Sequence, residues 1–519
     1  MRIIDNFDTG AAASPDRVFL IDAESGFERS YAQTSSFTHR FAHAVRARGL
    51  GEDTKIAVLG RNGVLMYETI LGILRSDAIW LPVNARSGLS EMVELLSRMD
   101  CDVLFYEEEA AEVASAMQEL DRPVETVPLT EEAIQSWIGA QPDQGFSPSS
   151  ESVESIYAIQ ATGGTTGTPK GVLFSNRNAR YIVSTFEAVA PFTPTLTNPY
   201  PVYLASAPLT HAAGQLMQLI MRQSGTAVVV RSASPTELLS LIDRFDVTHT
   251  FLPPTVIYGM LDSPEIDQHD YSSLQYLIYG ASPMSPERLT RAMDSFGPVL
   301  AQLYGQTETG VPNVWMSPSE HAVDDASAGN DRLTAAGRVT PGTDLVILDE
   351  SGQPVPQGTV GEIAVAGDGV TPGYYGDPEG TASSYSGRYF LTGDIAYMDD
   401  EGFIHIVDRR KDMIITGGFN VFSAEVERRI MAFPGIAECA VLGVPDPKWG
   451  ERVTAFIEPT AGETTDLDRL REFCREALGP IKTPKEFIIR ASLPRSAVGK
   501  VLKRELRQEI WGDSQRRVS

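Results

Sequence analysis

The feature that most constrains the fold is an alternation of short apolar runs with amphipathic helical stretches. The apolar runs predict strands, and they lie at residues 155–160, 202–208, 226–232, 274–280 and 299–305. Residues 285–296 show the helical period, and Ser285 and Pro286 predict the N-cap and first residue of that helix. Strands that alternate with helices are typical of α/β proteins with a largely parallel sheet. The sequence therefore predicts an α/β fold.

The chain is too long for one hydrophobic core. With 519 residues, it is expected to form at least two domains. A dense charge cluster at 408–412 separates the strand–helix pattern from a different one, which begins with a hairpin-like TGGFN turn and ends with a basic helix. We therefore predict an N-terminal α/β domain at 1–410 and a C-terminal α+β domain of normal domain size at 411–519.

The net charge of the chain excludes two classes of binding partner. The formal net charge is −26, which repels nucleic acid and anionic lipid, so neither is expected to bind.

Cys101, Cys439 and Cys474 follow no metal or disulfide spacing. The N-terminus lacks the pattern of a signal peptide, and no apolar run reaches the ~18 residues that a membrane span needs. We expect a cytoplasmic protein. Its oligomeric state is not given by the sequence, although a homodimer is one candidate.

The stretch ATGGTTGTPKGV at 161–172 has the composition of an anion-binding loop. Its glycines let successive N–H groups converge on a phosphate, its threonines add hydroxyl donors, and Lys170 supplies a cation. It is not a Walker A loop, because Pro169 precedes the lysine and Gly171 follows it. A flexible surface loop is the alternative interpretation of these residues taken alone.

The whole stretch resembles the phosphate-binding signature of the adenylate-forming superfamily, which comprises acyl- and aryl-CoA synthetases with their luciferase and peptide-synthetase relatives. Gly163 departs from it, since many members have serine there. Further segments match the family's motifs in the same order, at 278–283, 301–310, 389–396, 408–427 and 494–506. The resemblance implies a large N-terminal α/β domain of several subdomains, a small mobile C-terminal domain, and ATP, Mg²⁺ and coenzyme A as cofactors.

The same resemblance assigns nucleotide roles to individual residues. Tyr304 would stack on adenine beside Gly305, Thr307 would contact the α-phosphate, and Glu308 would ligate Mg²⁺, which prefers carboxylate oxygen. Asp394 would accept hydrogen bonds from both ribose hydroxyls, with Arg409 near the ribose. The remaining nucleotide contacts would come from the phosphate loop and the adenine-bordering segment: Thr162, Gly163, Gly164, Thr165, Thr166, Gly167, Lys170, Gly280, Ala281 and Ser282. Singly, Glu308 could face solvent and Asp394 could be an ordinary turn residue.

The resemblance also implies a two-step reaction. Lys500 would bridge the substrate carboxylate and the α-phosphate in the first step, and the C-terminal domain would then swing about Lys411. That movement would present Gly417 and Gly418 to a pantetheine tunnel, with Trp449 against the coenzyme A arm. Taken alone, these features have other readings: a solvated charged helix for Lys500, a hairpin turn for the glycines and a partly buried tryptophan.

Near residues 480–485, Lys482 and Lys485 could meet coenzyme A phosphates. Ile481 and Thr483, however, stand where a halobenzoate-CoA ligase has an aromatic residue and an arginine. This departure keeps open whether coenzyme A is the acceptor.

Residues 207–215, APLTHAAGQ, resemble the family's acyl-pocket motif, with His211 as its gate and as a catalytic candidate. A core histidine is the alternative. No Asp or Lys is placed to recognise a substrate amino group, so the pocket is expected to be apolar and to suit an aromatic, medium-chain or bulky cyclic acid. Its predicted lining is His211, Ala212, Ala213, Gly214, Phe251, Gly310 and Val311.

These residues favour an AMP-forming carboxylic acid–CoA ligase. A carboxylate resists attack by a thiol, and joining it to AMP gives a mixed anhydride with a good leaving group. Two alternatives remain: an enzyme that hands its acyl-adenylate to a carrier protein or a second ligase, and a non-catalytic nucleotide or acyl sensor.

Overall fold

The computed structural model describes residues 2–150, 152–162, 170–321, 332–460, 462–463, 465–495 and 501–511. These residues belong to two compact units, the first formed by Met1–Leu345 and Val365–Phe390, the second by Val346–Ala364 and Leu391–Ser519. The predicted boundary after residue 410 lies inside the second unit and stays a prediction. Each unit is described by itself below.

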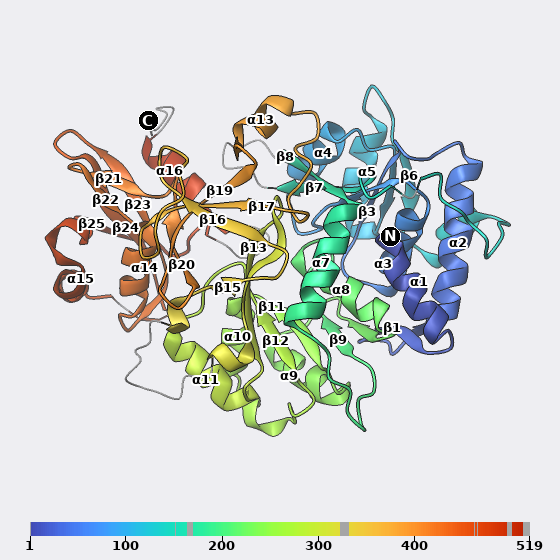
Figure 1. Ribbon diagram of the computed structural model, residues 1–519, viewed down its shortest axis with the longest axis horizontal. Helices are drawn as coiled ribbons and strands as arrows, with labels where there is room; N and C mark the ends of the chain where they lie inside the picture. The colour runs from blue at the N-terminus through green and yellow to red at the C-terminus, as the bar shows by residue number, and fades with distance from the viewer. Residues whose placement is uncertain are drawn as a thin grey trace. The chain divides into compact units, whose positions relative to one another are not determined.

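The first unit contains two sheets (Figure 1). In the part of the chain that the structure describes, one sheet has the strand order β6-β5-β3-β4-β7-β8. Its strands are parallel except for the antiparallel pair β7 and β8. They are β3 (Lys55–Leu59), β4 (Ile79–Pro82), β5 (Val103–Tyr106), β6 (Glu125–Pro128), β7 (Ile156–Thr162) and β8 (Lys170–Ser175).

The other sheet of this unit has the order β15-β14-β13-β12-β11-β9-β10-β1-β2. From β13 to β1 the strands are parallel, and antiparallel strands flank them on both sides. Its strands are β1 (Val18–Asp22), β2 (Glu28–Ser30), β9 (Val202–Ala205), β10 (Thr226–Val229), β11 (His249–Leu252), β12 (Tyr276–Tyr279), β13 (Leu300–Gln306), β14 (Gly310–Met316) and β15 (Gly337–Val339).

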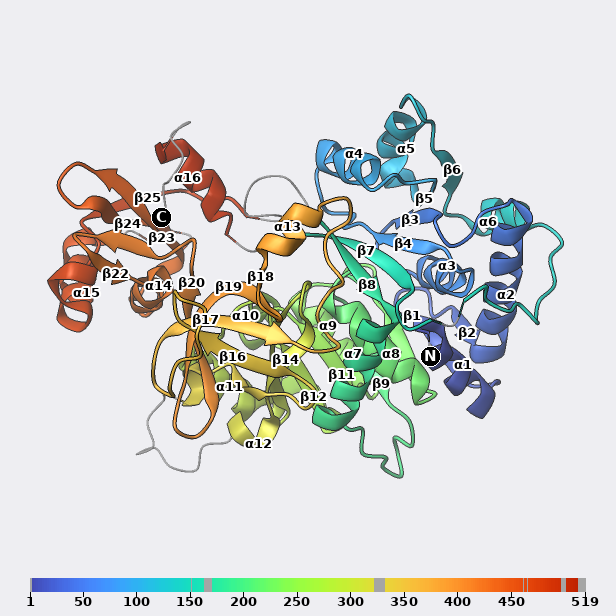
Figure 2. The same ribbon diagram turned by 45° about the horizontal axis from the view of Figure 1, so that its top comes forward.

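Helices fill the space between the two sheets and cover their outer faces (Figure 2). The central core takes side chains from both sheets and from α1 (Ile4–Ala13), α2 (Tyr31–Ala47), α3 (Val64–Arg75), α7 (Asn176–Val189) and α8 (Ala212–Arg222). The outer cores are built on α4 (Leu89–Arg98) and α5 (Ala111–Gln118) for one sheet, and on α9 (Pro235–Arg244), α10 (Pro254–Leu261) and α11 (Pro286–Phe296) for the other. The unit also contains α6 (Glu131–Ile138), α12 (Pro318–His321), α13 (Pro378–Ser383), β18 (Tyr385–Ser386), η1 (Glu108–Ala110), η2 (Ile266–Gln268) and η3 (Arg332–Thr334).

Strand side chains alternate between these cores. On β3, Ile56 and Val58 join the central core while Ala57 and Leu59 join an outer one. Successive side chains of a strand point to opposite faces of the sheet, so strands covered by helices on both faces are apolar throughout. This explains why the apolar runs of the sequence are continuous rather than alternating.

The strands of the second unit form two groups. One part contains β16 (Asp344–Leu348), β17 (Gly361–Ala366), β19 (Tyr389–Met398) and β20 (Phe403–Arg409), neighbours in that order. The C-terminal sheet has the order β22-β21-β24-β23, with β25 beside β24. Its elements are β21 (Ile414–Thr416), β22 (Phe419–Val421), β23 (Ile436–Asp446), β24 (Gly450–Pro459), β25 (Glu486–Ile489), α14 (Ser423–Met431), α15 (Leu467–Lys482) and α16 (Lys503–Trp511).

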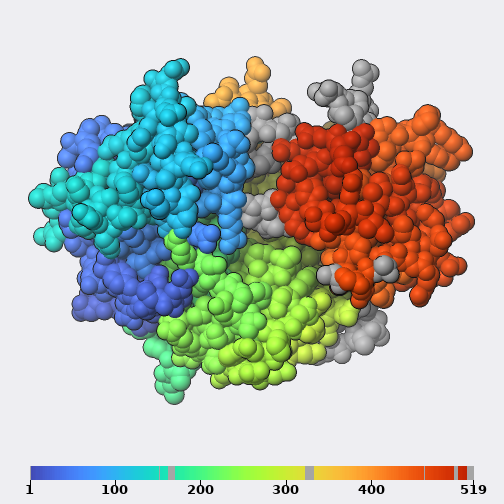
Figure 3. Space-filling view, turned by 180° about the vertical axis from the view of Figure 1, so that it is seen from behind, coloured from blue at the N-terminus to red at the C-terminus, as the bar shows by residue number. Residues whose placement is uncertain are grey.

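Helices cover the C-terminal sheet on both faces. Val426 and Ile430 of α14 and Leu470 of α15 share one core. Leu506 of α16 belongs to a separate small cluster with Leu442 of β23. In the space-filling view, α16 is the deep red surface of this unit (Figure 3).

The local predictions are confirmed. Each of the five apolar runs overlaps a strand. Residues 285–296 contain α11, whose N-cap Ser285 accepts a hydrogen bond from the Arg288 N–H while Pro286 begins the helix. The TGGFN turn joins β21 and β22. The sequence interpretation did not identify the elements of the first 150 residues, which supply β1 to β6.

Candidate active site

The glycine- and threonine-rich loop joins two antiparallel strands of the first unit. Thr162, at the end of β7, pairs with Lys170, at the start of β8. The strand pair therefore fixes both ends of the loop. The predicted phosphate-binding residues Gly163, Gly164, Thr165, Thr166 and Gly167 lie outside the described residues, as does the side chain of Thr162.

Tyr374 connects the lysine of this loop to the predicted magnesium ligand. The Lys170 Nζ lies 4.2 Å from the centroid of the Tyr374 ring, a cation–π contact, and 3.8 Å from Asp377 Oδ2. The Tyr374 hydroxyl donates to Glu308 Oε1 at 3.4 Å. Burial and the nearby charge of Glu308 raise the pKa of Tyr374 to about 12, so the hydroxyl keeps its proton at neutral pH. The structure thus brings Lys170 and Glu308 to one tyrosine.

Tyr374 was missed by the sequence interpretation. It stands in the segment GYYGDP, where a tyrosine pair lies between two glycines. Aromatic residues in a glycine-rich loop are a signal for a binding segment, since loops positioned by a rigid scaffold often contain binding residues. That signal does not say which residues the tyrosine contacts.

Thr307 and Glu308 occupy the turn between β13 and β14. The buried Thr309 donates its hydroxyl hydrogen to Asn313 Oδ1 at 2.5 Å, and the Asn313 amide donates to the Thr309 carbonyl at 3.0 Å. The Thr371 N–H also donates to the Glu308 carbonyl at 2.8 Å. These bonds fix the backbone of the turn and leave the side chains of Thr307 and Glu308 partly exposed.

Two glycines of this hairpin are required by close backbone approaches. A Cβ on Gly305 would lie 2.7 Å from the Gly310 carbonyl oxygen. Gly310 has a φ of 71°, which glycine adopts without strain. Tyr304, next to Gly305 on β13, is partly exposed, as stacking on a ligand requires.

The predicted adenine-bordering segment follows β12 directly. Tyr279 of β12 pairs with Gln302 of the parallel neighbour β13. A Cβ on Gly280 would lie 2.9 Å from the Leu303 carbonyl oxygen, so glycine lets the chain leave β12 close to β13. Ala281 and Ser282 are exposed beyond it. The segment and Tyr304 therefore lie on neighbouring strands at their carboxyl ends, where ligands bind in α/β sheets.

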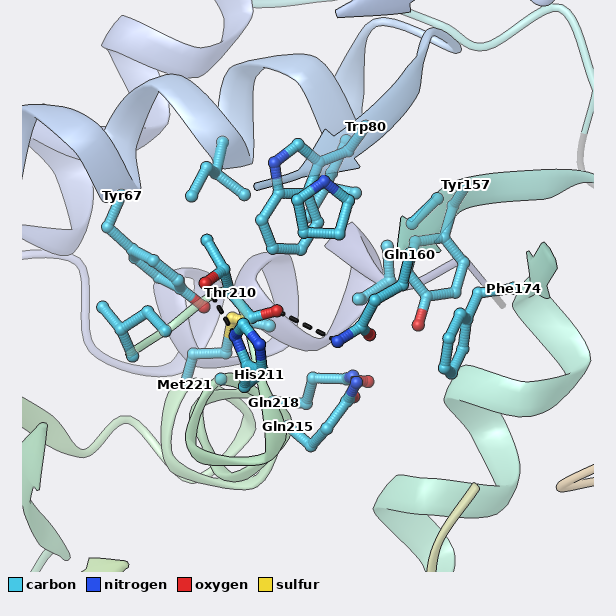
Figure 4. A pocket seen from close by; sticks show the side chains of 17 residues that line it. Tyr67, Trp80, Tyr157, Gln160, Phe174, Thr210, His211, Gln215, Gln218 and Met221 are labelled. Carbon is cyan, nitrogen blue, oxygen red and sulfur yellow. Dashed lines mark hydrogen bonds between the residues drawn. The ribbon is translucent and has the colours of Figure 1, made fainter. Parts of the chain in front are cut away.

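His211 is the N-cap residue of α8 and lines a cavity inside the first unit (Figure 4). The His211 Nδ1 lies 2.9 Å from the Thr210 hydroxyl, and the Gln160 amide donates to the Thr210 carbonyl at 3.2 Å. Burial lowers the pKa of His211, so its ring is neutral at pH 7. Most of the wall is aromatic or aliphatic and includes Ile3, Tyr67, Ile70, Leu74, Trp80, Pro82, Tyr157, Phe174, Leu209 and Met221.

The cavity contacts only part of the predicted acyl-pocket lining. His211 and Gly214 line it, whereas Ala212, Ala213, Phe251, Gly310 and Val311 do not. A Cβ on Gly214 would lie 2.0 Å from the Leu209 carbonyl oxygen, so its small size lets α8 begin close to the preceding chain. Ala213 is a buried residue of the central core. These two small residues therefore have a packing role, which the sequence interpretation did not include.

The cavity-facing side of α8 could have been found from the sequence. His211, Gly214, Gln215, Gln218 and Met221 all line the cavity and follow each other at spacings that place them on one helix face. Gln215 and Gln218 are the residues missed. Their signal is two glutamines on the same face as the predicted gate histidine, in a helix that is otherwise apolar up to its last residue, Arg222.

A second cavity in this unit is polar and was also missed. Arg61, Arg86 and Arg231 line it, together with Asn62 and Thr210, and Thr210 also lines the first cavity. Arg231 forms ion pairs with Glu107 at 2.6 Å and Glu109 at 2.9 Å. Arg61 and Arg86 form no ion pair with any residue that the structure describes. Three arginines around one cavity suit an anionic ligand.

In the second unit, the predicted ribose residues lie opposite each other on adjacent strands. Asp394 of β19 pairs with Arg409 of β20, and the Arg409 Nε donates to Asp394 Oδ1 at 3.2 Å. The Asp394 side chain is almost fully buried, whereas that of Arg409 is half-exposed. The predicted hinge residue, Lys411, follows two residues later. Burial is the main cause that lowers the pKa of Lys411, to about 8.

The predicted pantetheine-tunnel residues also lie together. Gly417, with a φ of 57°, donates its N–H to the Trp449 carbonyl at 2.7 Å. A Cβ on Gly417 would lie 2.8 Å from the Trp449 ring, whereas a Cβ on Gly418 would meet no atom within 4 Å. Trp449 is 45% exposed. Lys482, a candidate for coenzyme A phosphate, forms a salt bridge with Glu425 at 2.7 Å.

The predicted catalytic residue Lys500 lies outside the described residues. The chain on either side of it is well anchored. Arg495 and Val501 form an antiparallel bridge. Arg495 contacts Glu438 and Glu458, both at 3.3 Å, and Lys503 contacts Glu427 at 2.7 Å.

The described residues contain no preformed metal cluster and no helix that could span a membrane. No group of three or more histidine, cysteine or carboxylate side chains among the described residues could hold a metal ion without further ligands. One carboxylate, Glu308, fits a Mg²⁺ ion that takes its other ligands from nucleotide phosphates and water. Across the same described ranges, no helix is long and apolar enough to cross a bilayer.

Comparison with known families gives two matches. The model of the AMP-binding enzyme family matches residues 7–375. The model of the AMP-binding enzyme C-terminal domain matches residues 425–500.

Individual proteins are similar along almost the whole chain. The fatty acid–[acyl-carrier-protein] ligase ScoC of Streptomyces coeruleorubidus is 32% identical over 94% of this chain and 93% of its own length. A feruloyl-CoA synthase of an Amycolatopsis species is 33% identical over 93% of this chain and 94% of its own. The crystal structure of ATP-bound MatB from Rhodopseudomonas palustris has a TM-score of 0.87 at 27% identity and covers 99% of both chains.

Proposed function

This chain belongs to the AMP-binding enzyme family, the adenylate-forming superfamily of the acyl-CoA synthetases, and we propose that it converts a largely apolar carboxylic acid into its coenzyme A thioester. The reaction would use ATP and pass through an acyl-adenylate. The observation that carries the proposal is the arrangement of Lys170, Tyr374 and Glu308. It joins the end of the phosphate loop to the predicted magnesium carboxylate.

In the first step, a carboxylate oxygen of the acid attacks the α-phosphorus of ATP, and diphosphate leaves. Two anions must approach each other, so fixed positive charge aimed at them is expected to dominate the rate. Lys500 is proposed to bridge the two reacting anions, and Lys170 and the threonine hydroxyls of the loop to bind the departing diphosphate. Glu308 would hold Mg²⁺, which supplies Lewis-acid neutralisation of the phosphates.

Further roles are proposed for the residues that the family motifs assign to the nucleotide. Tyr304 is proposed to stack on adenine next to the 280–282 segment, and Thr307 to contact the α-phosphate. Asp394 and Arg409 are proposed to hold the ribose. Their observed ion pair would then be exchanged for contacts with the ribose hydroxyls.

In the second step, the coenzyme A sulfur attacks the acyl carbonyl, and AMP leaves. The Gly417–Trp449 contact supports a proposed pantetheine passage, since a side chain at 417 would enter the space of the tryptophan ring. Arg61 and Arg86 of the polar cavity are suited to the phosphates of coenzyme A. Lys411 is proposed to be the hinge between the two steps.

One alternative has an observation in its favour. The similarity to ScoC, named as a fatty acid–[acyl-carrier-protein] ligase, supports a carrier protein as the acyl acceptor. The salt bridge of Lys482 with Glu425 also engages one of the two lysines expected to meet coenzyme A phosphates. A non-catalytic sensor is disfavoured, because Glu308, Asp394 and Arg409 are all present.

A panel of acids tests the proposal in a diphosphate-release assay with ATP and Mg²⁺, with and without coenzyme A. The panel contains medium-chain, aromatic, arylpropanoic and bulky cyclic acids. We expect diphosphate with at least one class and the corresponding thioester, detected by mass spectrometry, when coenzyme A is present. Diphosphate without thioester would favour the carrier-protein alternative, and no diphosphate with any acid would refute the proposal.

The variant Lys500→Ala separates the two steps. We expect diphosphate release to fall by about 10²–10³-fold. Thioester formation from chemically prepared acyl-adenylate should be retained, since the proposed role of Lys500 ends with the first step. Unchanged diphosphate release would contradict that role.

A further inference from the structure

The cavity beside His211 contains hydrogen-bonding groups that the protein does not satisfy. Gln218, on α8, is 2% exposed, and its Oε1 has no hydrogen-bond partner among the described residues. Its Nε2 donates to Gln215 Oε1 at 2.8 Å. If the amides are placed in the opposite sense, the unpartnered atom of Gln218 becomes the nitrogen instead. In either orientation, one buried polar atom of Gln218 is unsatisfied.

Two tyrosines also line the same cavity. The hydroxyls of Tyr67, on α3, and Tyr157, on β7, donate to no atom that the structure describes. Burial raises the pKa of both well above the ordinary value, so both stay protonated and able to donate. Figure 4 shows these rings on opposite sides of the glutamine side chains. A largely apolar wall thus contains both hydroxyl donors and amides.

Buried polar groups without a hydrogen-bond partner reduce the stability of a folded protein unless a ligand or water supplies the partner. A buried unsatisfied polar group typically costs a protein ~1–3 kcal/mol, and most such groups in native structures are paired. An apolar residue at 218 would avoid the cost. The arrangement is explained if a bound molecule supplies the missing partner.

The space for that partner is small. The cavity offers about 30 Å³ to the centres of water-sized molecules, which corresponds to roughly two water molecules. A hydroxyl group is of that size, and it can donate to an oxygen or accept from a nitrogen or a tyrosine hydroxyl. It therefore satisfies Gln218 in either amide orientation.

We propose that the acid activated by this enzyme has a hydroxyl group remote from its carboxylate, and that Gln218 recognises this hydroxyl in the cavity beside His211. This inference rests on the proposed function and adds the substrate class to it. The cavity takes the hydroxyl end of the acid, and the amides select that end. Gln218 is thus a specificity-determining residue.

The test uses pairs of acids that differ only in the hydroxyl. Suitable pairs are 3-phenylpropanoic and 3-(4-hydroxyphenyl)propanoic acid, cinnamic and 4-hydroxycinnamic acid, and octanoic and 8-hydroxyoctanoic acid. The measured quantity is kcat/KM for diphosphate release by the full chain. For at least one pair, we expect the hydroxylated acid to be preferred at least about tenfold, because a site built to bind a hydroxyl rejects the analogue that lacks it.

The variant Gln218→Met has nearly the same volume and no amide. We expect this variant to lower kcat/KM for the hydroxylated acid by about 10–100-fold. Its kcat/KM for the acid without the hydroxyl should change little. Gln223→Met is the matched control. Gln223 also has a buried Oε1 without a partner among the described residues, but it does not line the cavity, so its substitution should leave the preference unchanged.

Thermal unfolding of the same variants distinguishes a ligand site from a structural one. If the amide serves a ligand, Gln218→Met should be as stable as the parent chain or more stable, because an unsatisfied group is removed. Reduced stability with an unchanged preference would mean structural water only and would overturn the inference. Gln160→Met, at the β7 wall, gives a second measurement of the preference should Gln218→Met fail to fold.

The outcomes separate the two proposals. Diphosphate release with equal kcat/KM for both members of every pair would refute the hydroxyl recognition and leave the adenylation proposal intact. Absence of diphosphate with every acid would refute the adenylation proposal and, with it, this inference.

Discussion

The Lys503 ammonium lies 2.7 Å from Glu427 Oε1 and 2.9 Å from the Ser423 hydroxyl, which joins α16 to α14. Burial opposes the charge of this lysine, but the carboxylates of Glu427, Asp412 and Asp408 outweigh it and raise the pKa of Lys503. One turn later on α16, Arg507 pairs with Asp412 at 2.8 Å. The helix that follows the predicted catalytic residue is therefore tied to the segment that contains the predicted hinge.

Removing the ammonium should destabilise the second unit. Breaking a buried ion pair by substituting one partner costs about 3–5 kcal/mol, and we expect Lys503→Met to approach the lower value because its side chain is still 19% exposed. Hydrogen exchange of the β23 and β24 amides in increasing denaturant measures the change. Lys482→Met is the control. Its salt bridge to Glu425 is partly exposed, so a loss of less than about 1 kcal/mol is expected, and equal losses would contradict the argument.

The lowered pKa of Lys411 predicts that the free energy of unfolding of the second unit depends on pH. This pKa is lowered from 10.5 to about 8, mainly by burial and also by Arg409 and Arg507, against the opposing charge of Asp412. Between pH 8 and 10.5 the unfolded chain binds a proton that the folded chain has lost, so this residue makes stability rise with pH in that window. Below pH 8, both states are protonated and its contribution is constant.

Substitution with methionine removes that contribution. We expect Lys411→Met to stabilise the second unit at pH 7 by at most about 3 kcal/mol, and the gain to shrink as the pH rises from 8 to 10. Denaturant unfolding, with β23 and β24 exchange as the probe, checks it at several pH values. A gain independent of pH would contradict the lowered pKa.

Removal of the Tyr374 hydroxyl is expected to slow the adenylation step. Tyr374→Phe keeps the ring below Lys170 but removes the hydrogen bond to Glu308, so we expect kcat/KM for diphosphate release to fall by about tenfold. Tyr374→Leu removes both contacts and should have a larger effect. The neighbouring Tyr375, whose hydroxyl donates to Asp100 at 2.8 Å, provides the matched control. If Tyr375→Phe were as impaired as Tyr374→Phe, the Glu308 contact would not be the cause.

Gly417 and Gly418 predict different effects of the same added methyl group. Both have positive φ, which disfavours alanine by ~1–2 kcal/mol, but only at 417 would the methyl meet the Trp449 ring. We therefore expect Gly417→Ala to slow thioester formation by about 10–100-fold more than Gly418→Ala. The reason is that the added methyl group would displace the Trp449 ring, which is proposed to position the coenzyme A arm. Diphosphate release without coenzyme A should be similar in both variants. Equal thioester rates would show that the tryptophan does not border the thiol path.

The parts of the fold that could be predicted are those determined by residues close together in the sequence. The N-cap at Ser285, the strands on either side of the glycine–threonine loop and the hairpin of β21 and β22 follow from neighbouring residues. The resemblance also grouped Asp394 with Arg409, and the structure pairs them on adjacent strands; their role at a ribose stays a prediction. Such motifs are short and keep their order along the chain, so one sequence is enough to find them.

Contacts between distant segments were not predictable in the same way. Lys170, Glu308 and Tyr374 meet because three separate segments converge in one unit, and no local pattern encodes that convergence. Lys503 belongs to a charged run that alone resembles a solvated helix, yet it is largely buried because carboxylates from α14 and the hinge segment surround it. Gly214 lines the cavity, as predicted for the acyl pocket, but the close approach of the Leu209 carbonyl, which also requires a glycine there, was not predictable from the local sequence.

The alternation of strand side chains between cores has a consequence for evolution. On β7, Ala158 and Gln160 line the cavity while Ile159, between them, packs into the outer core with α4 and α5. Changes at the cavity-facing positions leave that outer core untouched. Descendants of this chain could therefore change the lining of the cavity while the outer core on the other face of the strand stays the same.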